Sequence, residues 1–485
     1  MGGEKKERLP PFWDLDGKKD DRTGERWYTP IHKEVERMRT LLKNVDTIVS
    51  YDGEDRIYKN TDLWFSDGRI ERIGPSDRQA DRVFDCSGML LYPGFVNTHH
   101  HLYQYFTRSL ELVQGMELFD WLRTLYEIWK NLNGDTVYLS TLAAMGELMR
   151  YGCTTCFDHH YVFPKGAGDL IVRQMEAADR LGIRFVASRG SMDLSKKDGG
   201  LPPDSVVQTI DEILADSRRL IEAYHHPETD RMHDIVLAPC SPFSVSGDLM
   251  RESASLARAY GVRLHTHVGE TMDEENYTLS RFGRRPVAYM ESLGWVGDDV
   301  WYAHGIHMND AELDLLAATG TGVAHCPNSN MKLHSGVCRV PDMLKRGVKV
   351  GLAVDGSASN DGSNMMDEIR SAFLLHRLTW GEQAPTGYEL LKMATAGSAA
   401  LLGRSDIGSI EEGKRADCFL IQKEQPDLLC AELDPLDLFG NVGYHKPCDL
   451  VFVNGKLTVQ AGQILTVDEG RLYREGRREI ERLLG

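Results

Sequence analysis

The central part of the chain alternates short apolar stretches with longer amphipathic ones. Short apolar runs predict buried strands, and stretches such as 139–151 and 249–260 have the periodicity of helices. The strand candidates are Gly94–Asn97, Thr154–Asp158, Ile183–Ala187, Ile235–Ala238, Val262–His267, Val300–Ala303, Gly322–His325 and Val348–Val354. Eight strand–helix units in succession predict an α/β fold of the (β/α)8 TIM-barrel type. A doubly wound sheet is the alternative, but the glycine-rich turn that usually follows its first strand is missing.

Two further strand-rich segments lie at opposite ends of the chain. The candidates are Val45–Ser50, Asp62–Phe65 and Ile70–Ile73 at one end, and Ala416–Ile421 and Leu450–Val459 at the other. They can pair only if the middle of the chain forms a unit of its own, which predicts a small β-sandwich domain built from both chain ends. The predicted division is an N-terminal extension (1–40) with a short helix at Ile31–Leu42, the β-sandwich domain (41–92 and 403–465), the catalytic barrel (93–402) and a C-terminal helix (466–485).

Side chains that bind metals well occur where the predicted barrel strands end. His99 and His101 form a His-x-His pair, whose rings share one face of a strand because side chains alternate. His267 and Asp355 follow other strands, and the carboxyl ends of barrel strands meet at one mouth. These four donors predict a site for one divalent ion, Zn²⁺ or Fe²⁺, with water in an open position. A surface histidine tract is the plainer interpretation, but it ignores the distant partners.

The same strand ends supply groups for proton transfer. A divalent ion lowers the pKa of a bound water from 15.7 towards about 7. Asp355 can ligate the ion and take a proton from that water, and His304 can orient the nucleophile or stabilise developing charge. Glu270, three residues after His267, can protonate a ring nitrogen and then the leaving group. Together these groups suit the hydrolytic removal of an amino group from an electron-poor heterocycle.

Composition excludes several classes of partner. The net charge of −17 argues against binding to nucleic acid or to anionic membranes. The nine cysteines are scattered, which fits no disulfide framework and favours a reducing cytoplasm. Met1–Arg8 has no apolar core of the signal-peptide type, and no apolar run approaches the roughly 18 residues of a membrane span. We expect a cytoplasmic protein.

Several motifs resemble the amidohydrolase superfamily, in its cytosine/guanine deaminase and triazine hydrolase branch. They are Pro93–His101, His265–Glu270, Ala303–Gly305, His325–Ser329, Val354–Asn360 and Gly408–Asp417, and the resemblance covers about residues 44 to 460. It implies a mononuclear metal held by residues matching His99, His101, His267 and Asp355. It also implies that residues matching Glu270 and His304 take part in proton transfer and water activation.

Within this branch, the stretches His99–Gln104, Asp158–Pro164 and Arg189–Pro203 favour a deaminase of an oxopurine, with 8-oxoguanine as the favoured substrate and urate and ammonia as products. Isocytosine, guanine and isoxanthopterin are close alternatives, since each presents the same amino-amidine edge. An aminohydrolase or chlorohydrolase of s-triazines and a catalytically inactive binding protein are the other hypotheses. The resemblance implies that Gln104 faces the heterocycle, because an amide offers both a donor and an acceptor. Arg189, at the end of a predicted strand, is expected to bind a carbonyl oxygen or an anionic ring of the substrate, with a surface ion pair as the alternative; a homo-oligomer is left open.

Overall fold

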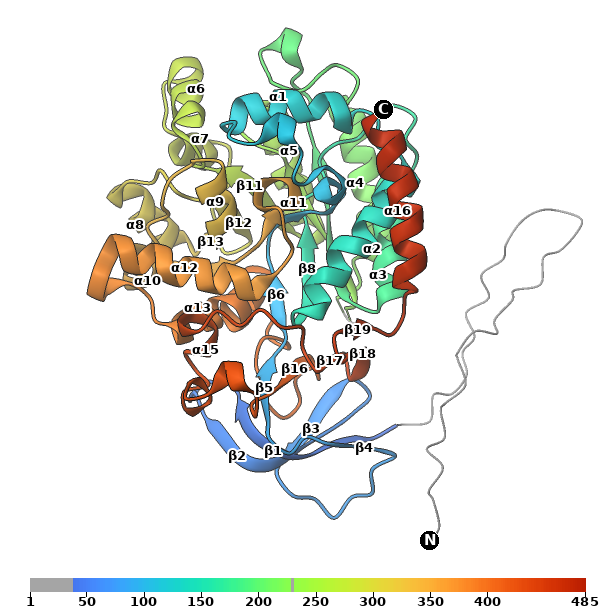
Figure 1. Cartoon of the computed structure of the whole chain (residues 1–485). Helices are drawn as coiled ribbons and strands as arrows, with labels where there is room; N and C mark the ends of the chain where they lie inside the picture. Colours follow the sequence, from blue (N-terminus) through green and yellow to red (C-terminus); the bar gives the residue numbers. More distant parts are fainter. Residues whose placement is uncertain (1–37, 228–230) are drawn as a thin grey trace, which may run out of the picture.

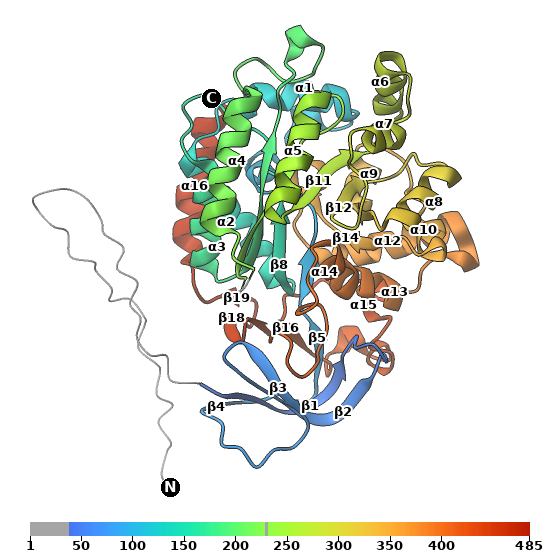
Figure 2. The same ribbon diagram turned by 180° about the vertical axis from the view of Figure 1, so that it is seen from behind.

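The computed structural model describes residues 38–227 and 231–485 of the chain (Figure 1). An eight-stranded parallel sheet forms its centre, and each strand falls on a stretch predicted from the sequence. In spatial order the strands are β6 (Phe95–Asn97), β8 (Cys153–Asp158), β9 (Arg184–Ser191), β10 (His233–Pro239), β11 (Arg263–Val268), β12 (Val300–His304), β13 (Gly322–His325) and β14 (Val350–Leu352). Helices surround the sheet on its outer side in both views (Figures 1 and 2), so the predicted (β/α)8 barrel is confirmed.

Two very short strands join the first and last strands of the barrel. β7 (His100–His101) pairs in parallel with β15 (Asp355–Gly356). The backbone N–H of Asp355 donates to the carbonyl of His99 at 3.1 Å. The residue before Asp355 makes a similar contact, because the N–H of Val354 donates to the side-chain oxygen of Asn97 at 3.0 Å. This seam therefore holds together residues that the sequence predicts to be metal ligands.

Local sequence signals set where the outer helices begin and end. In α3 (Leu170–Leu181), the side chain of Asp169 accepts from the N–H of Val172, and Gly182 ends the helix in the left-handed conformation. Capping residues also flank several of the other helices around the barrel. The other long barrel helices are α2 (Gly134–Arg150), α4 (Ile210–Tyr224), α5 (Gly247–Tyr260), α8 (Asp310–Thr319), α10 (Val340–Arg346) and α12 (Met365–Trp380).

Apolar side chains fill the inside of the barrel. Trp301 is fully buried there, and its ring lies 5.0 Å from that of Phe157 in an edge-on contact. Val96, Val186 and Val236 belong to the same buried cluster. The barrel is therefore a packed core rather than a pore, and its polar groups gather where the strands end.

The second sheet has nine strands and uses both ends of the chain. They are β1 (Thr40–Val49), β2 (Ile57–Ser66), β3 (Arg69–Ile73), β4 (Arg82–Asp85), β5 (Met89–Pro93), β16 (Cys418–Gln422), β17 (Leu450–Val453), β18 (Lys456–Gln460) and β19 (Gln463–Ile464). β5 connects the two halves, because it pairs with β1 on one side and with β16 on the other. The predicted small β domain built from both chain ends is confirmed, and its residue boundaries stay a prediction.

The start of the described chain differs from the prediction. The helix expected over Ile31–Leu42 lies mostly outside the described residues, and Thr40–Leu42 belong to β1. These three residues pair with both β2 and β4, so they are bound inside a sheet instead. At the other end, α16 (Glu469–Leu484) lies along α2 (Figure 1). Among the described residues, no helix combines the length and apolar character that crossing a membrane requires.

Candidate metal centre

The predicted donors converge at the carboxyl end of the barrel. The ring of His99 lies 4.7 Å from that of His101 and 4.9 Å from that of His267, and Oδ1 of Asp355 lies 3.1 Å from Nε2 of His99 and 3.3 Å from Nε2 of His101. All four residues are buried. Residues far apart in the chain therefore form one compact cluster, as the barrel topology predicts.

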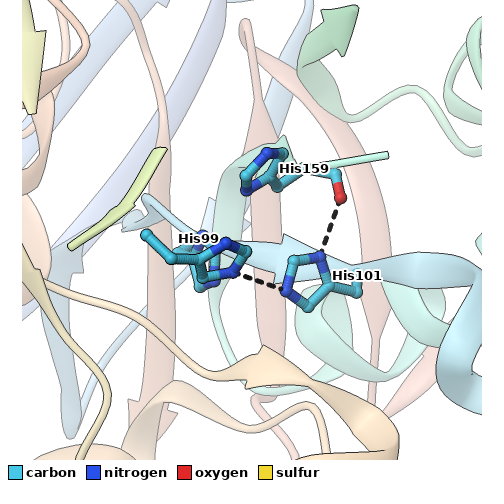
Figure 3. A group of neighbouring side chains, drawn as sticks. His99, His101 and His159 are labelled. Atoms are coloured by element: carbon cyan, nitrogen blue, oxygen red, sulfur yellow. Dashed lines mark hydrogen bonds between the residues drawn. The ribbon is translucent and has the colours of Figure 1, made fainter. Parts of the chain in front are cut away.

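Backbone carbonyls fix the ring orientation of two of these histidines. The Nδ1 atom of His101 lies 2.7 Å from the carbonyl oxygen of His159 (Figure 3), and Nδ1 of His267 lies 2.6 Å from that of Cys240. A carbonyl can only accept, so each Nδ1 carries the proton and each Nε2 keeps its lone pair. The two Nε2 atoms are only 3.2 Å apart.

A second histidine sets the tautomer of His99. Nδ1 of His265 lies 2.9 Å from the carbonyl oxygen of Trp301 and therefore donates to it. Nε2 of His265 is then an acceptor, and it lies 2.8 Å from Nδ1 of His99. His99 consequently donates through Nδ1, and its Nε2 lone pair lies 3.1 Å from Oδ1 of Asp355. Nε2 of His99 has no hydrogen-bond partner among the described residues.

This arrangement fits a cation. Burial lowers the pKa of His99 to about 3 and holds that of His267 well below its usual value, so both imidazoles are neutral. Three nitrogen lone pairs and a carboxylate oxygen then face one another with no proton between them. Neutral imidazole nitrogen and carboxylate oxygen are the donors that zinc and similar divalent ions take, and hydrogen bonds on the far nitrogens are typical of such sites.

His159 lies beside the same cluster. Its Nδ1 or Nε2 falls within 4.8 Å of donor atoms of His99, His101 and His267, and its ring stacks on that of His267 at 4.7 Å. Nε2 of His159 lies 2.8 Å from the carbonyl oxygen of Ala238, so this ring also has a hydrogen bond to the barrel backbone. A second group of donors joins His99 with His304 and Asp355.

Glu270 and His304 form an acid–base pair next to the donors. Oε2 of Glu270 lies 3.5 Å from Nε2 of His304, whose Nδ1 lies 2.9 Å from the side-chain oxygen of Asn330. Burial, together with the charge of Asp355, raises the pKa of Glu270 well above its usual value and so favours the protonated form of this carboxyl. The backbones of His304 and Asp355 have positive φ angles of 72° and 63°. Such strain in non-glycine residues tends to occur at functional sites.

A small cavity opens onto these groups. Its empty space is about 360 Å³ when the part open to solvent is included, and it is lined by His101, Gln104, Leu118, Trp121, Leu122, Tyr161, Cys240, Phe243, His267, Glu270, His304, Leu333, Asp355 and Ser359. Gln104 lies against Gly356, where an added Cβ would come within 2.0 Å of the glutamine oxygen. That oxygen is buried without a hydrogen-bond partner among the described residues, so a bound molecule can supply one.

Arg189 is the predicted site residue that the structure does not bring to this cavity. Its guanidinium is buried in an ion pair with Asp216 at 2.6 Å, donates to Gln208 at 2.9 Å and stacks on the ring of Phe163. Gly190 accepts from the remaining terminal nitrogen. Its donors are engaged by the protein, so Arg189 is not placed for the substrate contact predicted from the sequence, and its guanidinium is buried rather than in a surface ion pair.

Some groups at the site carry no signal in the sequence. Ser329 and Ser359 donate to Oδ2 of Asp355 at 2.5 and 3.1 Å, and Glu274 accepts from the N–H groups of Gly269 and Glu270. Of the apolar side chains over the cavity, Leu118, Trp121 and Leu122 lie on one helix, whereas Tyr161 and Phe243 lie in loops without a periodic pattern. Only the capping position of Glu274 at the start of α6 (Met272–Phe282) is recognisable in advance, because Thr271 precedes it at helix-cap spacing.

Comparison with known proteins finds a family and several individual proteins to which this chain is similar. The amidohydrolase family matches residues 90–458. An 8-oxoguanine deaminase of Pseudomonas aeruginosa is 47% identical over 391 residues, which are 80% of this chain and 86% of that protein. A hydroxydechloroatrazine ethylaminohydrolase of Pseudomonas sp. strain ADP is 38% identical over 90% of this chain and 94% of that protein. The crystal structure of an atrazine chlorohydrolase from Arthrobacter aurescens TC1, complexed with zinc, superposes with a TM-score of 0.88 at 32% identity, covering 91% of this chain and all of that one.

Proposed function

Because the chain belongs to the amidohydrolase family, we propose that it is a metal-dependent deaminase that converts 8-oxoguanine to urate and ammonia. The observation that carries the reaction type is the cluster of bare imidazole nitrogens and a carboxylate with Glu270 and His304 beside it. The observation that favours the substrate is the 47% identity to an 8-oxoguanine deaminase.

The proposed ligands of a single zinc or iron ion are His99, His101, His267 and Asp355. Three of them offer Nε2 with the proton held on Nδ1, and the fourth offers a carboxylate oxygen at 3.1 to 3.3 Å from two of those nitrogens. When bound, the ion makes a water molecule nucleophilic at neutral pH. Ser329 and Ser359 hold the second oxygen of Asp355 in place.

Three residues of the chain move or hold the protons. Asp355 accepts a proton from the attacking water, which adds to the amino-bearing carbon of the ring. Glu270 gives its proton to the neighbouring ring nitrogen, and a proton then passes to the amino group, which leaves as ammonia. His304, oriented by Asn330, donates or accepts at Nε2 next to the reacting carbon and stabilises the charge that develops there. Water and 8-oxoguanine thus give urate and ammonia with all atoms balanced.

The cavity supports a small planar ring as substrate. Its lining combines aromatic and aliphatic side chains with a few polar groups, as is typical of sites for small molecules. Gln104 supplies the amide edge that orients the heterocycle. A triazine aminohydrolase is the second candidate, because a relative with that activity in its name is 38% identical. Isocytosine, guanine and isoxanthopterin present the same amino-amidine edge and are alternative substrates.

The cellular location and the partners of the protein are part of the same proposal. The nine cysteines are free in the structure, which supports a reducing cytoplasm as the site of action. The net charge of −17 supports a small heterocycle and water, rather than nucleic acid or a membrane surface, as the partners.

Ammonia release by purified, metal-loaded protein tests this function. We expect turnover of 8-oxoguanine to exceed that of guanine, isocytosine, isoxanthopterin and hydroxyatrazine, with about one equivalent of zinc or iron per chain. His267→Ala should lose metal and activity together. Turnover of hydroxyatrazine alone would favour the second candidate, and a protein without bound metal or activity would contradict both.

A further inference from the structure

One buried tryptophan differs from all the others that the structure describes. Five tryptophans in the described ranges are at most 4% exposed. In four of them the indole N–H has an acceptor: Trp64 donates to Gly74, Trp129 to Thr107, Trp295 to Met250 and Trp301 to Thr98, at 2.8 to 3.2 Å. The exception is Trp121, whose Nε1 is buried with no partner in the described chain. Trp121 is also the tryptophan that lines the cavity.

The cavity has a second group in the same condition. Of its lining residues, Gln104 and Trp121 are the two with a buried polar atom that lacks a partner in the part of the chain that the structure describes. Gln104 contributes an acceptor and Trp121 a donor. A buried polar group without a partner costs about 1–3 kcal/mol, so such groups at a cavity are expected to be satisfied by a ligand.

The two groups come from different elements around the cavity. Gln104 lies against Gly356, which directly follows the proposed metal ligand Asp355, so Gln104 lies next to the metal centre. Trp121 lies on α1 (Leu118–Trp129), which crosses over the end of the barrel (Figure 1). Leu118 and Leu122 of the same helix also line the cavity and add apolar surface to it. A donor in apolar surroundings discriminates strongly between ligands that have an acceptor and those that lack one.

We propose that Trp121 determines specificity by donating its indole N–H to the carbonyl oxygen on the five-membered ring of an oxidised purine. This inference rests on the proposed function and refines it. The amino-bearing six-membered ring faces the metal ligands and Gln104, and the five-membered ring extends towards α1. Guanine presents no carbonyl at that end, so it leaves the indole N–H unpaired, whereas 8-oxoguanine satisfies it.

Binding of the two reaction products tests the contact without turnover. Urate retains this carbonyl and xanthine lacks it. Titration calorimetry on the metal-loaded protein should give a lower Kd for urate than for xanthine. Trp121→Phe keeps an aromatic ring but removes the N–H, so it should weaken urate binding roughly tenfold to a hundredfold and leave xanthine binding nearly unchanged. The matched control is Trp129→Phe, which removes an N–H that Thr107 accepts outside the cavity and should leave the urate-to-xanthine ratio as in the wild type.

Kinetics with the wild type separates the inference from the proposed function. The ratio of kcat/KM for 8-oxoguanine over guanine should fall in Trp121→Phe by the same factor as the ratio of binding constants. A wild type that deaminates 8-oxoguanine, with a Trp121→Phe variant that keeps the urate preference, would overturn the inference alone. Equal losses for urate and xanthine would also overturn it, because they would indicate a purely structural role. A wild type without activity on any oxopurine would overturn both.

Discussion

Replacing His265 should weaken metal binding although this residue is not a ligand. Nε2 of His265 accepts a hydrogen bond from Nδ1 of His99 at 2.8 Å, and Nδ1 of His265 donates to the carbonyl oxygen of Trp301. In His265→Phe, the Nδ1–H of His99 would be buried without an acceptor. The proton of the imidazole would then favour Nε2, where Oδ1 of Asp355 lies 3.1 Å away and can accept it. A protonated Nε2 cannot bind a metal ion.

The expected loss follows from this change of tautomer. Removing a hydrogen-bond partner of a metal-binding histidine typically lowers metal affinity 10- to 100-fold. This corresponds to about 1.4 to 2.8 kcal/mol of binding free energy. His265→Gln should restore most of the affinity, because its amide oxygen can accept from the same Nδ1–H.

Competition with a chromophoric zinc chelator at neutral pH measures the effect. The matched control is His325→Phe, since His325 is also a buried histidine at a strand end but contacts His376 at 3.1 Å, outside the metal centre. His325→Phe should lower the melting temperature without changing the zinc affinity. Wild-type affinity in His265→Phe, or an equal loss in His325→Phe, would refute the tautomer argument.

Three other predictions concern the proton donor Glu270, the cavity wall at Gly356 and the buried Glu274 of α6. Glu270→Gln should keep its metal content but slow the chemical step roughly a hundredfold or more in single-turnover measurements; an unchanged rate would remove Glu270 from the mechanism. Gly356→Ala places a Cβ where the Gln104 oxygen lies and should raise KM about tenfold, with little further effect of Gln104→Ala in the double variant; full additivity would contradict the contact. Burial raises the pKa of Glu274 from 4.5 to about 7, so the folded chain keeps a proton that the unfolded chain releases, and stability should fall by about 3 kcal/mol as pH rises through that interval. Denaturant unfolding of Glu274→Gln should lack this slope, and an unchanged slope would assign it to another group.

The barrel and the proposed ligands are visible in the sequence because they follow from short-range patterns. Buried strands appear as apolar runs, and a His-x-His pair at a strand end places two rings on one face. The barrel topology then brings His267 and Asp355 to the same mouth without any local motif linking them. The coincidence of donors at strand ends is what allows the cluster to be predicted.

The remaining parts depend on contacts that no local pattern records. Arg189 follows a barrel strand as the ligands do, yet Asp216 on a neighbouring helix engages its guanidinium. The environment of Trp121 is equally hidden, because whether an indole finds an acceptor depends on how α1 packs over the barrel. The sequence predicts a helix over Ile31–Leu42, but pairing with two strands places Thr40–Leu42 in a sheet. Tertiary contacts decide such cases.

The seam between β7 and β15 has a consequence for the life of the protein in the cell. His99 is synthesised early and Asp355 late, and they become neighbours only when the barrel closes. Until the chain up to Asp355 has left the ribosome, the polypeptide cannot offer a complete set of the proposed ligands. An ion bound to all four ligands would connect the first and last strands of the barrel.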